Sequence, residues 1–279
     1  MQQTVHGIIE NYSYLDRSLR MPSPLIPPSP SSLQELAQLL PTQWQAVVVS
    51  EPIAAAQWMQ QGANLGNADA QITLGQWLLD GHGVQRNPAQ ALAWFMKAAQ
   101  QGHPMGMNMT GRCFENGWGT EPDYFIAANW YRQAAHKGLD AGMYNLANLL
   151  ATGKGVALNH AAALAWYRQA AEQGHAKSKT KIGRYYETGL VVAQDTDVAF
   201  QYFEEGAKGG DFRGQFNYAG MLAARGQFDD AVAWLRKVPL TATPGYQREV
   251  GPLLLQSPHA AFRAVGQAML DRVTTPAVS

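Results

Sequence analysis

The sequence predicts an all-α fold made of repeated pairs of antiparallel helices. The first observation is a register of 36 residues: steps of this length from Trp94 reach Trp58, Trp130, Trp166 and Tyr202, and steps from Gly102 reach Gly66, Gly138, Gly174 and Gly210. The second is that small residues hold one position in every copy, at Gly75, Gly111, Ala147, Gly183 and Ala219. Self-similarity at a fixed period of this length is typical of helical repeat arrays.

Residues 1–31 form a proline-rich extension that precedes the repeats. Its segment from Pro22 to Pro30 excludes helix and favours an extended polyproline II conformation. We expect it to be partly disordered, either as a loosely docked lead-in or as a ligand for an aromatic groove of a partner. Ser32 and Glu35 then match a capping box, which predicts a short helix that ends at Leu40, before Pro41.

The repeat array is predicted over residues 32–239, and each full unit contains a first helix, a glycine-bearing loop and a second helix. We place a partial unit at 52–66, full units at 67–102, 103–138, 139–174 and 175–210, and a shorter unit at 211–239. Side-chain acceptors before each second helix predict N-caps at Asn87, Asp123, Asn159 and Asp195. The fourth loop carries Val191 where the others have a second glycine. The tryptophan column is predicted to fill the core between stacked helices.

Residues 240–279 lose the period, as expected where an array covers its last apolar face. Ser257 and Pro258 predict the start of a capping helix that reaches about Arg272, followed by a tail. Its predicted apolar stripe contains Ala261, Val265, Ala268 and Met269.

Composition argues against several classes of function. The 21 basic and 21 acidic residues cancel, whereas nucleic-acid binding needs a field of one sign. The single Cys113 excludes an internal disulfide and a cysteine-based zinc site, and we expect its side chain to be packed in a helix. No signal-peptide pattern or membrane-spanning run is present, so we expect a cytoplasmic, bacterial-type protein without membrane insertion. The histidines form no metal-binding pair and no activated nucleophile is evident. We therefore expect no catalytic residues, no metal and no cofactor.

The alanine pattern, the Trp or Tyr column, the Lys97-Ala98-Ala99 type of helix ending and the terminal glycine resemble the Sel1-like repeat, a relative of the tetratricopeptide repeat. The last unit, with Gly226 and a loop four residues shorter, resembles a tetratricopeptide turn. The resemblance implies a right-handed α-solenoid with helical caps. It also implies a non-catalytic scaffold or adaptor, as in the intracellular members of the family. The alternative is a hydrolase, or a binding protein for a small ligand such as a β-lactam or a cell-wall fragment, of the cysteine-rich type.

In such a solenoid the first helices line the concave wall, where we expect another protein to bind through an extended or acidic segment. The candidate residues run from an amide-rich middle to a basic end: Asn108, Arg112, Tyr144, Asn145, Asn148, Lys177, Lys181, Arg184 and Arg213. Asn145 with Lys177 and Lys181 loosely resembles the carboxylate clamp of tetratricopeptide domains, although Asn108 and Arg112 reverse its order. The alternative is a solvated face without a ligand. The partner and the oligomeric state are left open.

Overall fold

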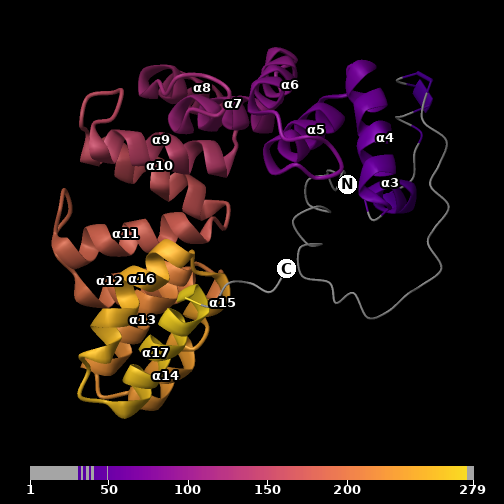
Figure 1. The fold of residues 1–279 in the computed structure, drawn as a ribbon. Coiled ribbons are helices and arrows are strands. Elements are labelled where there is room, and N and C mark those ends of the chain that lie inside the picture. Colours follow the sequence, from indigo (N-terminus) through magenta and orange to yellow (C-terminus); the bar gives the residue numbers. More distant parts are fainter. Residues whose placement is uncertain (1–30, 33, 36–37, 39–40, 49, 275–279) are drawn as a thin grey trace. The chain divides into compact units, whose positions relative to one another are not determined.

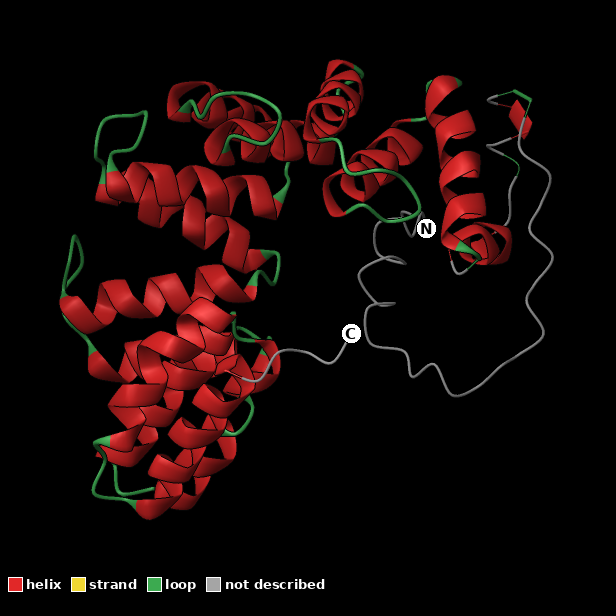
Figure 2. Cartoon of the chain, viewed as in Figure 1, coloured by secondary structure: helices red, strands yellow, loops and turns green. Residues whose placement is uncertain are grey.

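The computed structural model describes residues 31–32, 34–35, 38, 41–48 and 50–274, and within these ranges it contains helices and no strand (Figures 1 and 2). The helices are α3 (Pro41–Val48), α4 (Pro52–Asn64), α5 (Ala68–Asp80), α6 (Pro88–Gln100), α7 (Pro104–Asn116), α8 (Tyr124–His136), α9 (Asp140–Thr152), α10 (His160–Glu172), α11 (Ala176–Thr188), α12 (Thr196–Lys208), α13 (Phe212–Ala224), α14 (Phe228–Leu235), α15 (Val238–Thr241), α16 (Pro244–Leu255) and α17 (Ala260–Thr274). The predicted all-α fold of successive helix pairs is confirmed.

The chain divides into two compact units, and the division falls within α9. Among the described residues, unit 1 comprises those up to residue 145 together with 153–157, and unit 2 comprises residues 146–152 and 158–274. In unit 1, α4 packs on α5, α5 on α6, α6 on α7 and α7 on α8. In unit 2, the helices from α10 to α14 pack consecutively, and α16 packs on α17. Each unit therefore has a core of its own.

The core column of the repeat lies one residue beyond the predicted tryptophan column. Trp58 is buried, but Trp94, Trp130, Trp166 and Tyr202 are only partly buried. The fully buried column is formed by the residues that follow them: Met59, Phe95, Tyr131, Tyr167 and Phe203. The prediction that the tryptophans fill the core is wrong for the later copies, because the second helix turns the next residue toward its partner helix.

The small position in the first helix receives this aromatic column. A Cβ atom added at Gly75 would lie 2.6 Å from the ring of Phe95, and one added at Gly111 would lie 2.7 Å from the ring of Tyr131. Heavy atoms cannot approach so closely, so a larger residue would force the two helices apart. The small residues at this position therefore leave room for the aromatic ring of the second helix.

The loops between first and second helices confirm the predicted N-caps. For example, Asn87 Oδ1 accepts a hydrogen bond of 3.0 Å from the amide of Gln90, and Asp123, Asn159 and Asp195 cap their helices in the same way. The second glycine has an additional role, because a Cβ atom at Gly119 would lie 2.4 Å from the carbonyl oxygen of Pro88. Val191 takes this place in the fourth copy and keeps a left-handed φ of 57°.

The C-terminal cap contains more helices than predicted. α16, which begins after the cap residue Thr243, was not predicted, and it packs against α17 through a close approach of Gly251 to Gly266. In α17 the buried residues include Val265 and Met269, as predicted, whereas Ala261 and Ala268 are exposed. The two helices together cover the apolar end of unit 2.

The N-terminal predictions fall mostly outside the described residues. The proline-rich extension lies there except for Ser31, and so does most of the segment predicted to be a helix up to Leu40. The capping contact is present, since the amide of Glu35 donates to Ser32 Oγ at 3.2 Å. Pro41 opens the unpredicted α3, because proline is well accommodated in the first turn of a helix.

Candidate functional site

In unit 2 the structure brings three of the predicted basic residues together. Lys181 and Arg184 lie on α11 and Arg213 lies on α13, and we call these three residues, with the exposed Lys177 of α11, the basic cluster. Burial lowers the pKa of Lys181, and the positive charges of Arg213 and Arg184 lower it further, while Asp211 acts in the opposite direction. The cluster therefore holds like charges near a partly buried ammonium group.

Two arginines of the cluster have partners within unit 2. Arg184 forms an ion pair with Glu187, one turn further along α11. The guanidinium of Arg213 lies 4.6 Å from the ring centre of Phe212 and 5.1 Å from that of Tyr246. Tyr246 belongs to α16, the helix that was not predicted. Its ring also contacts Phe216 of α13, with the two ring centres 6.1 Å apart, so α16 packs on the surface of the first helix in the last unit.

The predicted amide residues are linked to one another or to the core. In unit 1, Asn145 Nδ2 donates a hydrogen bond of 2.8 Å to Asn108 Oδ1. Asn108 is buried, so the expectation that it contacts a bound segment directly is corrected. In unit 2, Asn148 Oδ1 accepts a hydrogen bond of 2.7 Å from the hydroxyl of Tyr167. These two hydrogen bonds involve the amino group of Asn145 and the oxygen of Asn148, and not the Asn145 oxygen or the Asn148 amino group.

Arg112 and Tyr144 complete the predicted set in unit 1. The Arg112 guanidinium lies 5.0 Å from the ring centre of Trp118, and its Nη1 approaches Met109 Sδ at 3.6 Å. Tyr144 is half-buried on α9. Both side chains therefore remain partly accessible.

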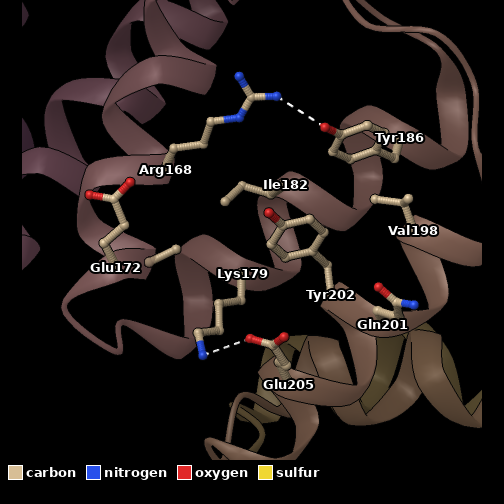
Figure 3. A pocket seen from close by; sticks show the side chains of 10 residues that line it. Arg168, Glu172, Lys179, Ile182, Tyr186, Val198, Gln201, Tyr202 and Glu205 are labelled. Atoms are coloured by element: carbon tan, nitrogen blue, oxygen red, sulfur yellow. Dashed lines mark hydrogen bonds and ion pairs between the residues drawn. The ribbon is translucent and has the colours of Figure 1, made fainter.

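A pocket that was not predicted opens in unit 2 between α10, α11 and α12 (Figure 3). The volume of this cavity is about 430 Å³. Its lining includes four charged residues and two tyrosines: Arg168, Glu172, Lys179, Glu205, Tyr186 and Tyr202. The sequence signal that could have revealed it is Lys179, because the other copies carry Gln71, Met107, Met143 and Gln215 at this position.

Among the described residues, no group of three histidine, cysteine or acidic side chains could hold a metal ion. Cys113 is fully buried, as expected, and burial raises the pKa of its thiol to about 12. His103 and His175, which each precede a first helix, are half-buried: His103 Nε2 lies 3.3 Å from Asp69 Oδ1, and His175 Nδ1 accepts a hydrogen bond from the Ser178 amide. In the part of the chain that is described, no helix combines the length and the apolar character that crossing a bilayer requires.

Comparisons with known proteins place these helix pairs among repeat proteins. The chain is similar to a Sel1 repeat protein from Oxalobacter formigenes, with 24% identity, a TM-score of 0.70, and coverage of 82% of this chain and 96% of the other. It is also similar to a protective antigen of uropathogenic Escherichia coli strains that displays an SLR fold, with 25% identity, a TM-score of 0.59 and coverage of 80% of this chain. This chain spans about half of that antigen, 49% of its length.

A third similar structure is an immunity protein from Pseudomonas aeruginosa, with 16% identity, a TM-score of 0.52, and coverage of 74% of this chain and 81% of the other. No curated protein matches the sequence. The model of the Sel1 repeat matches residues 48–67, 68–103, 104–139, 140–175 and 176–211, which is more than half of the chain. These boundaries agree with the 36-residue register to within one residue in the four full copies, and the protein belongs to the Sel1 repeat family.

Proposed function

We propose that the protein is a non-catalytic scaffold that binds another protein, and that the basic cluster receives an acidic group from an extended segment of that partner. Sel1 repeats generally mediate protein interactions, which supports the first half of the proposal. The observation that carries the second half is the crowding of positive charge around Lys181, whose pKa is lowered by burial and by Arg213 and Arg184.

An acidic ligand would relieve this crowding. Like charges that are close together repel, and an anion placed among them gains charge-assisted hydrogen bonds as well. The guanidinium of Arg213 lies 5.1 Å from the ring centre of Tyr246 on α16, and its charge lowers the pKa of Lys181 on α11. The ordering of an extended segment offsets part of the gain, so we expect an affinity on the order of micromolar that weakens with salt.

Amide side chains would hold the main chain of the segment. Asparagine both donates and accepts hydrogen bonds, as a peptide group requires. In unit 1 Asn108 orients Asn145 for this role, with Arg112 and Tyr144 beside the same first-helix surface. In unit 2 Tyr167 orients Asn148. Each unit therefore offers an amide side chain of its own.

The experiment begins with co-purification from the native source, which identifies the partner and its acidic segment. Binding of a labelled peptide with that segment is then measured by fluorescence anisotropy. We expect Lys181→Glu and Arg184→Glu to weaken binding at least tenfold, while Arg236→Glu, an exposed charge reversal at the end of α14, leaves it unchanged. Unchanged affinity in both cluster variants, with circular dichroism showing intact helices, would place the site elsewhere.

A further inference from the structure

The copy that contains the pocket between α10, α11 and α12 differs at two positions from the copy that lies 72 residues earlier. In unit 1 the equivalent positions, 72 residues earlier, carry Met107 and Trp130, which pack together in a small apolar cluster. In unit 2 these positions carry Lys179 and Tyr202. The Lys179 ammonium lies 2.8 Å from the carboxylate of Glu205, and both residues line the pocket. Figure 3 shows this pair at one edge of the pocket.

The inner part of the pocket is lined by aliphatic and aromatic side chains. Ile182 is fully buried, and Ala171 and Val198 join it in the lining. The rings of Tyr186 and Tyr202 are stacked, with centres 5.9 Å apart and planes inclined by 8°. Aromatic and aliphatic side chains around a preformed cavity are typical of sites that take an apolar part of a small ligand.

The rim has charged groups that are not all used within the protein. Lys179 and Glu205 neutralise each other. Arg168 donates a hydrogen bond of 3.0 Å to the Tyr186 hydroxyl and keeps further N–H groups, since a guanidinium has five. Glu172 lies one turn further along α10 and, among the interactions of the described residues, forms no ion pair. One cation and one anion, neighbours on the same helix, therefore remain at the mouth of the pocket.

We propose that this pocket binds a small zwitterion, namely an amino acid or a dipeptide with an apolar side chain. Arg168 receives the carboxylate, Glu172 receives the ammonium group, and the side chain enters the space between Ile182 and Tyr202. A ligand with a single charge would pair with only one of these two exposed side chains, whereas a zwitterion pairs with both. The volume of about 430 Å³ accommodates an aromatic amino acid or a small dipeptide.

The first test is calorimetric titration of the full chain with L-phenylalanine, L-leucine and L-leucyl-L-leucine. Two analogues each remove one charge: phenylalanine amide keeps the ammonium group, and N-acetylphenylalanine keeps the carboxylate. We expect at least one zwitterion to bind, and its affinity to exceed that of both blocked forms by tenfold or more. Equal binding by either blocked form, or no binding by any zwitterion at millimolar concentration, would overturn the proposal.

The second test locates the site with substitutions. Glu172→Gln and Arg168→Gln should each weaken binding tenfold or more, while Arg132→Gln, at the position of Arg168 in the preceding copy, should not. The double variant Lys179→Met with Tyr202→Trp installs the residues of unit 1 and should abolish binding while circular dichroism and the melting temperature show a folded chain. Binding that survives in this filled variant would show that the ligand occupies another place.

Discussion

The sharpest prediction about the fold concerns Phe95 and its neighbour Trp94. Phe95 is fully buried, and its ring lies against Gly75, whereas Trp94 is half-buried beneath the Lys97 ammonium, 3.9 Å from the ring centre. Truncation of a buried phenylalanine to alanine costs about 3–5 kcal/mol. For Trp94→Ala we expect about 1–2 kcal/mol, from the partial burial and a cation–π contact. Phe95, although it is smaller than Trp94, should therefore contribute more to the free energy of unfolding.

A double-mutant cycle with Gly75→Ala makes this prediction more specific. In the native protein the added methyl group would lie 2.6 Å from the Phe95 ring, an overlap that costs about 1–3 kcal/mol. In the Phe95→Ala background the ring is absent, and alanine is favoured over glycine in a helix by about 1 kcal/mol. The effect of Gly75→Ala should thus change sign.

The measurement is urea unfolding followed by far-UV circular dichroism. The expected order of stability losses is Phe95→Ala first, Trp94→Ala well below it, and a coupling of at least about 2 kcal/mol between positions 75 and 95. Additive effects of the two substitutions, or an equal loss for Trp94→Ala and Phe95→Ala, would refute the assignment of the core column.

Three further predictions concern the loops and the buried thiol. Gly119→Ala should destabilise the protein more than Gly138→Ala, because its Cβ atom would overlap Pro88 whereas Gly138 has free space and both have positive φ; thermal unfolding compares the two. Val191→Gly should stabilise the protein by about 1 kcal/mol, because a β-branched residue is strained at a φ of 57°; an unchanged or lower melting temperature would contradict this. Burial raises the pKa of Cys113 from 9.0 to about 12, so the contribution of its thiol to stability is present below pH 9 and is lost as the pH rises toward 12. The free energy of unfolding should therefore fall less between pH 9 and pH 10 in Cys113→Ala than in the native protein, by about 1 kcal/mol. An equal fall in both proteins would exclude this role.

The sequence was sufficient to predict the helix pairs, their register and their caps, because these features recur at a fixed spacing. It misidentified the core column, since Met59, Phe95, Tyr131, Tyr167 and Phe203 differ in identity while the partly exposed tryptophans repeat. A packed core accepts different apolar side chains of suitable volume, so the residue that repeats most faithfully is not always the one that is buried.

The C-terminal helices and the sites were harder to predict for a different reason. α16 has a recognisable start at Thr243 and Pro244, but Gly251 and Pro252 interrupt its pattern and no other copy repeats it. Tyr246 of this helix packs against Phe216 of α13. Since α16 was not predicted, the sequence alone could not show that it packs on this part of the first-helix surface of unit 2. Lys181, Arg184 and Arg213 of the basic cluster lie close together in unit 2, but their role in binding stays a prediction.

The departures from the repeat are concentrated in the fourth full copy. Lys179 replaces an apolar or amide residue, Val191 replaces a glycine at the cost of a strained φ, and Lys181 brings a charge into a partly buried place. Stacking of helix pairs explains the positions that all copies share, but it gives no reason for these three, two of which carry a free-energy cost. A repeat array needs only its shared positions to fold, so selection for binding is the simplest physical reason for keeping such residues on α11 and its loop. Both candidate sites of unit 2 share this helix, and reverting Lys179 and Lys181 separately would distinguish the pocket from the basic cluster.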